Sequence, residues 1–381
     1  MAWYVLAFGL FSCALLSKTV TASLPAAILL LLWWKRERLD VRVVLPLLPM
    51  VLAGAAAGSF TAWLESAHVG AQGEEFVLSL AERCLVAGRA LWFYAAKLLW
   101  PHPLVFIYPR WQIETAAWWQ WAFPAAALAV LGGLWTLHSR LGKAPFVAVA
   151  FFAGSLVPAL GFVNVYPMRF SFVADHFQYL ASIGLIVLAT AAATTLLARA
   201  GTLSRRVRTS ACALVLLPLG ALTWLQAGIY RDSETLWRAT VERNPSAWIT
   251  YNNLGMILDD QDRLDEAIAM YSQALRLKPD LTEAHNNLCA SLVRVGRLEE
   301  AKQHIVEAIR LRPRYQPFYV TLEMILEGQG KIDEAVSLYR KFLSIWPGYV
   351  EARLNLASLL FQQGRREEAA ALLDATRPDD E

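Results

Sequence analysis

Long apolar runs separated by short polar segments dominate the first 230 residues of the chain. The runs cover 2–17, 20–34, 43–64, 118–137, 144–163, 180–198 and 209–229. About 20 consecutive apolar residues are needed to span the hydrocarbon of a bilayer as a helix. Several runs approach this length, so the pattern predicts a helical membrane domain over 1–230 with about seven spans.

The hydrophobic pattern changes at about residue 231, where apolar positions begin to recur with a helical period. A unit of 34 residues occurs four times, at 248–281, 282–315, 316–349 and 350–381. Each copy has Leu at its seventh position and Ala at its twentieth, and three copies have Pro at the thirty-second position. This spacing is typical of tetratricopeptide repeats (TPRs), in which two antiparallel helices form one unit.

A half repeat at 231–247 precedes the full repeats, because Trp237 and Pro245 stand at the twenty-fourth and thirty-second positions of an incomplete unit. No segment shows the alternation expected of strands. The predicted fold class is therefore all-α, with a polytopic helical membrane bundle followed by an α-solenoid.

Charge divides the chain at the same place. Residues 1–230 contain 16 Lys and Arg against 8 Asp and Glu, whereas residues 231–381 contain 19 against 24. The net charge is too small and too divided to indicate a nucleic-acid partner. The four cysteines form no CxxC or Cys/His spacing, so no metal site or redox role is expected.

Basic segments at 35–42, 140–143 and 199–208 follow three of the apolar runs. The positive-inside rule places all three in the cytoplasm, provided that 65–117 crosses the membrane an even number of times. The stretch 76–100 carries four charged residues, which are too costly for a lipid-facing helix. We therefore expect an interfacial or re-entrant helix there, and an extracytoplasmic TPR domain.

Two of the segments predicted on the outer face contain candidate functional residues. Arg110 lies among aromatic residues in 104–112, and the loop 166–179 contains Arg169, Asp175 and His176. Arginine binds phosphate oxygens in pairs, and an acid next to an imidazole can tune it for proton transfer. The alternative is a polar loop that joins helices, with Asp175 capping the next helix.

The segments 18–34 (KTVTASLPAAILLLLWW), 104–112 (LVFIYPRWQ), 173–180 (VADHFQYL) and 232–255 resemble the transmembrane and tetratricopeptide repeat family. The eukaryotic members of this family act as O-mannosyltransferases with a GT-C-like architecture. The resemblance implies a bacterial inner-membrane protein with a periplasmic TPR domain, which transfers a sugar from a polyprenyl-phosphate carrier to a protein acceptor.

The same resemblance implies roles for individual residues. Arg169 and His176 become candidates for binding the carrier phosphate, together with Arg110 and Lys18. Asp175 and His176 become the candidate catalytic pair, with Asp175 orienting His176 or the acceptor.

This chain departs from the family in its first outer loop, where such enzymes place an essential acid. Here that loop is only Lys18–Thr19, so the chain is expected to begin several helices late and to lack the usual acid. Glu82 and Glu114 are other acids predicted on the outer face, although no motif favours them.

Asparagines recur on the first helix of the repeats, which lines the concave face of a solenoid. They occupy the fifth or sixth position of three repeats, at Asn252, Asn253, Asn286, Asn287 and Asn355. Side-chain amides can bond both the N–H and the C=O groups of an extended peptide, so this row is a candidate peptide-binding groove. Local hydrogen bonding within the repeats is the alternative.

Two further functions stay open at this stage. One is a non-catalytic, membrane-anchored scaffold that assembles envelope proteins through the repeats. The other is a polymerase or ligase of polysaccharide assembly, which also combines many spans with an outer loop rich in Arg and His. The sequence does not specify the sugar, the carrier or the acceptor.

Overall fold

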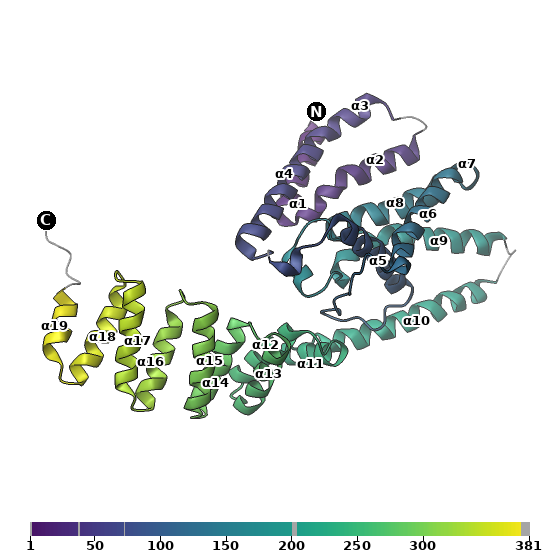
Figure 1. The fold of residues 1–381 in the computed structure, drawn as a ribbon. Coiled ribbons are helices and arrows are strands. Elements are labelled where there is room, and N and C mark those ends of the chain that lie inside the picture. Colours follow the sequence, from purple (N-terminus) through teal and green to yellow (C-terminus); the bar gives the residue numbers. More distant parts are fainter. Residues whose placement is uncertain (1, 37–38, 72, 200–203, 375–381) are drawn as a thin grey trace. The chain divides into compact units, whose positions relative to one another are not determined.

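The computed structural model describes residues 2–36, 39–71, 73–199 and 204–374, and every regular element in these ranges is helical (Figure 1). The predicted all-α fold class is therefore confirmed. The chain divides into two compact units, Met1–Arg231 and Asp232–Glu381. The half repeat predicted at 231–247 falls almost entirely within the second unit.

Each of the seven apolar runs of the N-terminal unit contains a main helix. These are α1 (Ala2–Ser17), α2 (Leu24–Lys35), α4 (Leu48–Leu64), α6 (Ala122–Thr136), α8 (Ala144–Leu156), α9 (Ser182–Arg199) and α10 (Arg205–Ile229). The short helices α3 (Val41–Val44) and α7 (His138–Leu141) precede α4 and follow α6. The remaining helix, α5 (Leu80–Leu99), lies within the predicted outer region.

Three helical segments are long and apolar enough to cross a membrane: Val41–Val69, Ser182–Arg199 and Thr209–Ile229. The helices at Ala2–Ser17, Thr19–Lys35 and Ala144–Ala159 are apolar but shorter. No residue in the apolar window of Thr209–Ile229 is buried, and Leu217 and Trp224 are 72% and 81% exposed. Exposed apolar surface on this scale requires an apolar partner or a lipid environment.

The α-helix in the apolar run 144–163 ends before the run does. Helix α8 stops at Leu156, and Pro158 lies in the 3₁₀ turn Val157–Ala159 that follows. Gly161 then adopts φ +92°, a left-handed conformation that favours glycine. The chain is thereby directed into the polar loop that contains Arg169, Asp175 and His176.

Glycines allow the closest helix approaches in this unit. A Cβ atom built on Gly88 of α5 would lie 2.5 Å from the backbone nitrogen of Pro124 in α6. One built on Gly184 of α9 would lie 2.5 Å from the carbonyl oxygen of Ala148 in α8. These two contacts fix the α5–α6 and α8–α9 pairs at distances that no larger residue permits.

The helix predicted over 76–100 is shorter than expected, because it begins at Leu80. Ser79 caps it: the Ser79 Oγ accepts from the Glu82 N–H at 3.3 Å, and the Glu82 carboxylate accepts from the Ser79 N–H at 2.7 Å. This reciprocal capping box satisfies two donors at the start of the helix. Glu82 thus has a structural role at the start of α5.

The other charged residues of α5 contact loops and aromatic rings. Arg83 donates to the carbonyl oxygen of Gly161 at 2.7 Å and to Asn164 Oδ1 at 2.9 Å. The Arg89 guanidinium lies 4.5 Å from the centre of the Trp111 ring. Lys97 donates to the Pro103 carbonyl oxygen at 2.5 Å. Because these cations have partners in neighbouring loops, the helix can carry them without exposing them to an apolar environment.

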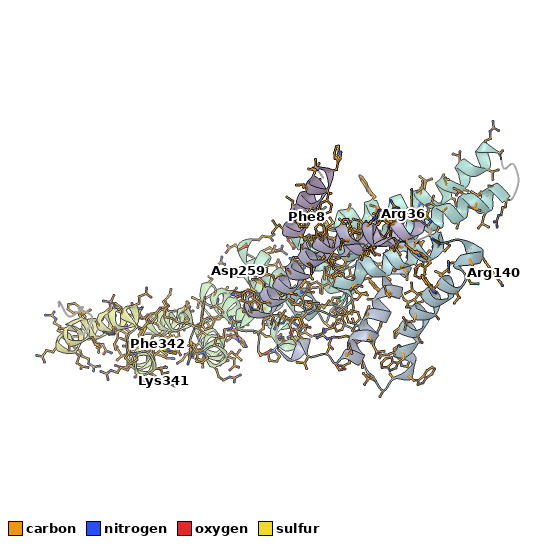
Figure 2. All side chains as sticks on the ribbon, turned by 90° about the horizontal axis from the view of Figure 1, so that it is seen from above. Phe8, Arg36, Arg140, Asp259, Lys341 and Phe342 are labelled. Atoms are coloured by element: carbon orange, nitrogen blue, oxygen red, sulfur yellow. The ribbon has the colours of Figure 1, made fainter. Side chains whose placement is uncertain are left out.

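In Figure 1 the ends of the helices that flank the basic segments lie along the right-hand side of the N-terminal unit. These are the C-terminal ends of α2 and α9, the N-terminal end of α10, and α7. Lys143 Nζ joins two of these segments, since it donates to the carbonyl oxygens of Trp33 at 3.1 Å and Arg36 at 2.9 Å. Figure 2 labels Arg36 and Arg140 on two of the segments. Residues 37–38 and 200–203 lie outside the described residues.

The second unit is an array of antiparallel helix pairs that follows α11 (Ser233–Arg243). The pairs are α12 (Trp248–Asp260) with α13 (Leu264–Leu277), α14 (Thr282–Arg294) with α15 (Leu298–Leu311), α16 (Pro317–Gly328) with α17 (Ile332–Ile345), and α18 (Val350–Gln362) with α19 (Arg366–Asp374). Each predicted repeat is one pair. The end of the fourth repeat, 375–381, lies outside the described residues.

The repeat positions noted in the sequence form the core of this array. The Leu at position seven and the Ala at position twenty are buried in all four repeats. Position fifteen has a left-handed backbone in every copy, at Asp262, Gly296, Gly330 and Gly364. Ionic contacts then join neighbouring repeats: Asp259 (Figure 2) accepts from Ser291 Oγ at 2.6 Å and pairs with Arg294 at 2.9 Å.

Candidate functional site

Three loop segments of the N-terminal unit pack together and contain most of the candidate site residues. We call the described residues of 65–79, 100–117 and 157–181 the loop cap. Its interior is apolar, with Phe76, Met168 and Phe172 buried beside Val86 of α5. A second cluster joins Tyr94 of α5 to Val105, Tyr108 and Val173 of the loops. The polar groups of the loop cap therefore lie on a packed apolar core.

Asp175, in the segment 173–180, is hydrogen-bonded to the segment 104–112, and both segments carry the family resemblance. Tyr108 Oη donates to Asp175 Oδ1 at 2.8 Å, and the adjacent Ala174 N–H donates to Tyr94 Oη at 3.2 Å. Burial raises the pKa of Asp175, while the Tyr108 hydrogen bond and the charge of Lys97 oppose that rise. Asp175 is the first residue of the 3₁₀ turn Asp175–Gln178, which begins after Ala174 without a side-chain cap.

His176 lies at the surface, within range of the charge of Lys18. The pKa of His176 is lowered, first by partial desolvation and second by the charge of Lys18. Its ring packs edge-on against Phe177, with the ring centres 4.5 Å apart. A lowered pKa favours the neutral imidazole, which is the form that accepts a proton. The structure thus brings Lys18 and His176 near each other, although they are far apart in the sequence.

Arg169 and Arg110 both contact Glu75, a residue that the sequence did not identify as a candidate. Arg169 Nε lies 2.6 Å from Glu75 Oε2, and Arg110 Nη2 donates to the backbone carbonyl oxygen of Glu75. The Arg110 guanidinium also lies 4.9 Å from the centre of the Phe172 ring. Desolvation lowers the pKa of Arg110, and the negative charge of Glu75 opposes this effect.

Aromatic rings connect the two polar groups of the loop cap. Phe172, under Arg110, lies 6.3 Å from Trp111, and Trp111 lies 5.9 Å from Phe93. Phe93 lies 4.9 Å from Tyr108, the partner of Asp175. All distances are between ring centres. The site therefore contains an arginine group around Glu75 and a second group around Asp175, joined by a row of aromatic rings. Asp175 contacts Tyr108, whereas His176 packs on Phe177.

Two acids of the loop cap carry contacts that sequence reasoning did not find. Glu75 holds the two arginines, and Glu65 Oε2 accepts from the Tyr166 N–H at 2.9 Å. Both follow the end of α4, where no local motif distinguishes them from Glu114, which is exposed. Only the packing of the loops brings them to their partners.

The asparagine row of the repeats is not uniform. Asn253, Asn286 and Asn287 are half-buried on the first helices of repeats one and two. Asn252 is buried, with only a 3.7 Å contact from its amide nitrogen to Met256 Sδ. Asn355 Nδ2 donates to Tyr339 Oη at 2.9 Å and to Glu323 at 3.4 Å. Asn355 is thus engaged within the repeat array, whereas Asn253, Asn286 and Asn287 stay candidates for binding a peptide.

The third repeat has Glu323 at its eighth position, where the other repeats have the small residues Gly255, Cys289 and Ala357. The Glu323 carboxylate accepts a short hydrogen bond from Tyr339 Oη, and the Asn355 amide binds both groups. In repeat one the same position is Gly255, where a Cβ atom would lie 2.7 Å from the Tyr271 ring. The third repeat thus replaces close ring packing with a buried polar cluster, which we call the Glu323 cluster (Glu323, Tyr339 and Asn355).

Within the ranges that the structure describes, no three His, Cys, Asp or Glu side chains are grouped so that they could hold a metal ion. Cys289 is buried in the repeat core, where burial raises the pKa of its thiol to about 12. A buried, protonated thiol is a poor nucleophile and a poor metal ligand.

Comparisons with known proteins support the second unit most directly. Tetratricopeptide-repeat family profiles match residues 248–281 and 326–381. The chain therefore contains tetratricopeptide repeats in its C-terminal unit.

A curated relative is similar to part of the chain. The chain is 27% identical over 139 residues to the protein O-mannosyl-transferase Tmtc2 of Drosophila melanogaster, and the match spans 36% of this chain and 14% of that protein.

Among solved structures, MamA is similar at 22% identity and a TM-score of 0.35, covering 39% of this chain and 87% of MamA. YrrB, described as a TPR protein with an unusual peptide-binding site, is similar at 22% identity and a TM-score of 0.32, covering 36% of this chain and 72% of YrrB.

Proposed function

We propose that this protein is a membrane glycosyltransferase that moves a sugar from a polyprenyl-phosphate carrier to a protein acceptor bound by its repeats. The observation that carries the proposal is the loop cap, which gathers Arg110, Arg169, Asp175 and His176 next to an apolar helical bundle. Cations beside a membrane surface suit a lipid that bears a phosphate. The similarity to a TPR-containing O-mannosyl-transferase points to the same activity.

In this proposal Arg169, Arg110 and Lys18 bind the carrier phosphate. The acceptor oxygen attacks the anomeric carbon of the sugar, and the bond from that carbon to the phosphate oxygen breaks. The bonding electrons remain on the polyprenyl phosphate, where the cations stabilise the developing charge. The acceptor proton passes to neutral His176, whose lowered pKa favours that role. Asp175, held by Tyr108, contributes negative charge beside it.

We propose that the loop cap and the repeats are extracytoplasmic and that the protein resides in a bacterial inner membrane. Support comes from the basic segments, whose flanking helix ends lie at one end of the bundle, as the positive-inside rule requires of cytoplasmic loops. Helices α8 and α9 run from that end to the loop cap and back. The loop cap is thus assigned to the opposite face of the membrane.

The test is sugar transfer by the full chain in lipid nanodiscs, supplied in turn with radiolabelled polyprenyl-phosphate hexoses and a protein acceptor. We expect transfer from one donor, and its loss in His176→Ala and Arg169→Ala with unchanged thermal stability. His68→Ala is the matched control, because His68 is an exposed histidine of the same loop cap that packs on Trp63. Absence of transfer from every donor would contradict the proposal.

A membrane-anchored scaffold is the second candidate function. The observation that favours it is that the residues matched by family profiles all lie in the repeat array. Such arrays bind partners along their concave face without chemistry of their own. A scaffold would retain its protein partners in Arg169→Ala and His176→Ala and would bind no phosphate lipid.

A further inference from the structure

Given the phosphate-binding role proposed above, we propose that the Glu75 carboxylate is an internal placeholder for the ligand phosphate. It pairs with Arg169, and the phosphate group of the lipid carrier displaces it from Arg169 on binding. Glu75 thereby sets the affinity of the site for phosphate.

The first argument is geometric. Glu75 contacts both arginines through different atoms, with its carboxylate on Arg169 and its backbone carbonyl oxygen on Arg110. The backbone contact can persist while the side chain moves, so the loop need not unfold for Arg169 to change partner. The side chains of Arg169 and Glu75 are 26% and 33% exposed, so a ligand can reach the pair from solvent.

The second argument is chemical. Guanidinium groups bind carboxylate and phosphate through the same planar fork of N–H donors. A carboxylate at 2.6 Å from Arg169 Nε therefore occupies a position that suits a phosphate oxygen. Partly exposed ion pairs contribute little net stability, so exchange of one anion for another at Arg169 is energetically easy. The phosphate gains from Arg110 as well, which already lies close to Glu75.

Arg83 provides a contrast within the same unit. Its guanidinium binds the neutral oxygens of Gly161, Asn164 and Leu78, at 2.7, 2.9 and 3.2 Å. These contacts join α5 to the loop cap. Because their acceptors are neutral oxygens, a phosphate could not replace an anion at any of these three bonds. Arg83 is thus a structural residue, whereas Arg169 pairs with an anion, the Glu75 carboxylate, that a ligand can replace.

The experiment measures binding of geranylgeranyl phosphate to the full chain in neutral nanodiscs by titration calorimetry. Inorganic phosphate and geranylgeraniol are the comparison probes. Removal of the competing carboxylate in Glu75→Gln is expected to tighten binding roughly tenfold, and Arg169→Ala to weaken it by a similar factor. Glu75→Asp keeps the charge and should not tighten binding.

Glu65→Gln is the matched control. It removes the same charge from the same loop cap, but Glu65 accepts from the Tyr166 N–H instead of pairing with an arginine. Equal tightening in Glu65→Gln would mean that general electrostatics is responsible, and would overturn the placeholder role. Thermal unfolding of each variant verifies that the fold is retained.

The remaining outcomes separate this inference from the proposed function. If the wild type binds and Glu75→Gln binds equally or more weakly, the placeholder fails and the phosphate site stands. If no variant binds the phosphate lipid, both fail. If the binding pattern holds without sugar transfer, the placeholder stands and the transferase function falls. If inorganic phosphate binds as tightly as geranylgeranyl phosphate, and the variants change its affinity in the same way, the ligand is a free phosphate.

Discussion

Tyr108 Oη donates a 2.8 Å hydrogen bond to Asp175 Oδ1, joining two loops that lie 67 residues apart in the sequence. Each loop carries one of the short segments on which the family resemblance depends. The bond shows that these segments form one structure, and it fixes the position of the Asp175 carboxyl group against Tyr108.

Replacement of Tyr108 by Phe should destabilise the N-terminal unit most at neutral pH. Burial already raises the pKa of Asp175 above 3.8, so the stability that this residue contributes at low pH is lost as pH rises through its folded pKa. Loss of the Tyr108 donor raises that pKa further. We expect a loss of roughly 1–3 kcal/mol at about pH 7, and less at about pH 4.

Thermal unfolding in detergent at the two pH values measures this effect. Tyr179→Phe is the control, because it removes the same hydroxyl from an exposed tyrosine near Asp175. An equal effect of Tyr108→Phe at both pH values would mean that its hydroxyl does not interact with an ionised Asp175.

Gly88→Ala should disrupt the packing of α5 on α6. The added Cβ would lie 2.5 Å from the Pro124 nitrogen, in a backbone contact that cannot adjust without moving a helix. We expect a loss of roughly 1–3 kcal/mol, as for other overpacked contacts. Gly132→Ala on α6 is the control, since nothing lies within 4 Å of its Cβ position. Equal thermal midpoints for the two variants would contradict this packing.

Glu323→Gln should remove a pH dependence of the repeat array. Burial raises the pKa of Glu323 above 4.5, mainly by desolvation, so the wild-type array loses stability as pH rises from about that value through the folded pKa. Glutamine accepts the Tyr339 bond without ionising. We expect a gain on the order of 1 kcal/mol at about pH 7 and little change at about pH 4.

Hydrogen exchange of α16, α17 and α18 in the intact protein measures this difference between the variant and the wild type at each pH. Glu351→Gln, on the exposed surface of α18, is the charge control. Protection that changes equally in the two variants would show that burial of Glu323 is not the cause.

Asn287→Ala and Asn355→Ala should have different effects. Asn287 is half-buried at the sixth position of repeat two, so its loss should weaken binding of an extended peptide roughly threefold to tenfold with little change in stability. Asn355 binds Tyr339 and Glu323, so its loss should cost about 1 kcal/mol of stability. Peptide titration and thermal unfolding of both variants separate these effects. A stability loss only in Asn287→Ala would reverse the assignment.

Reporters fused after residue 381 should show that the C-terminus lies outside the cytoplasm. A phosphatase that is active only outside the cytoplasm, fused to the C-terminus, is expected to be active, and a reporter that fluoresces only in the cytoplasm is expected to be dark. The reason is the position of the basic segments, which the positive-inside rule assigns to the cytoplasm. The opposite result would place the loop cap on the wrong face for the proposed transferase.

Local patterns in the sequence determined the helices and the repeats. The Leu and Ala positions of the 34-residue unit are buried in all four copies, because helical periodicity places each of them on the apolar face of its own helix. Ser79 and Glu82 similarly specify the start of α5, three residues apart. The sequence also selected Arg110, Arg169, Asp175 and His176 through their short motifs, but it did not show what they contact.

Only the tertiary structure decided those contacts, because they join residues that are distant along the chain. Glu75 meets Arg169 across 94 residues, Tyr108 meets Asp175 across 67, and Lys18 affects the pKa of His176 from the first loop of the chain. Hydrophobic periodicity fixes which face of each helix is buried, whereas the partners of a loop side chain depend on how loops without periodicity pack. For this reason Glu75 and Glu65 could not be distinguished from the other outer acids until the loops were seen together.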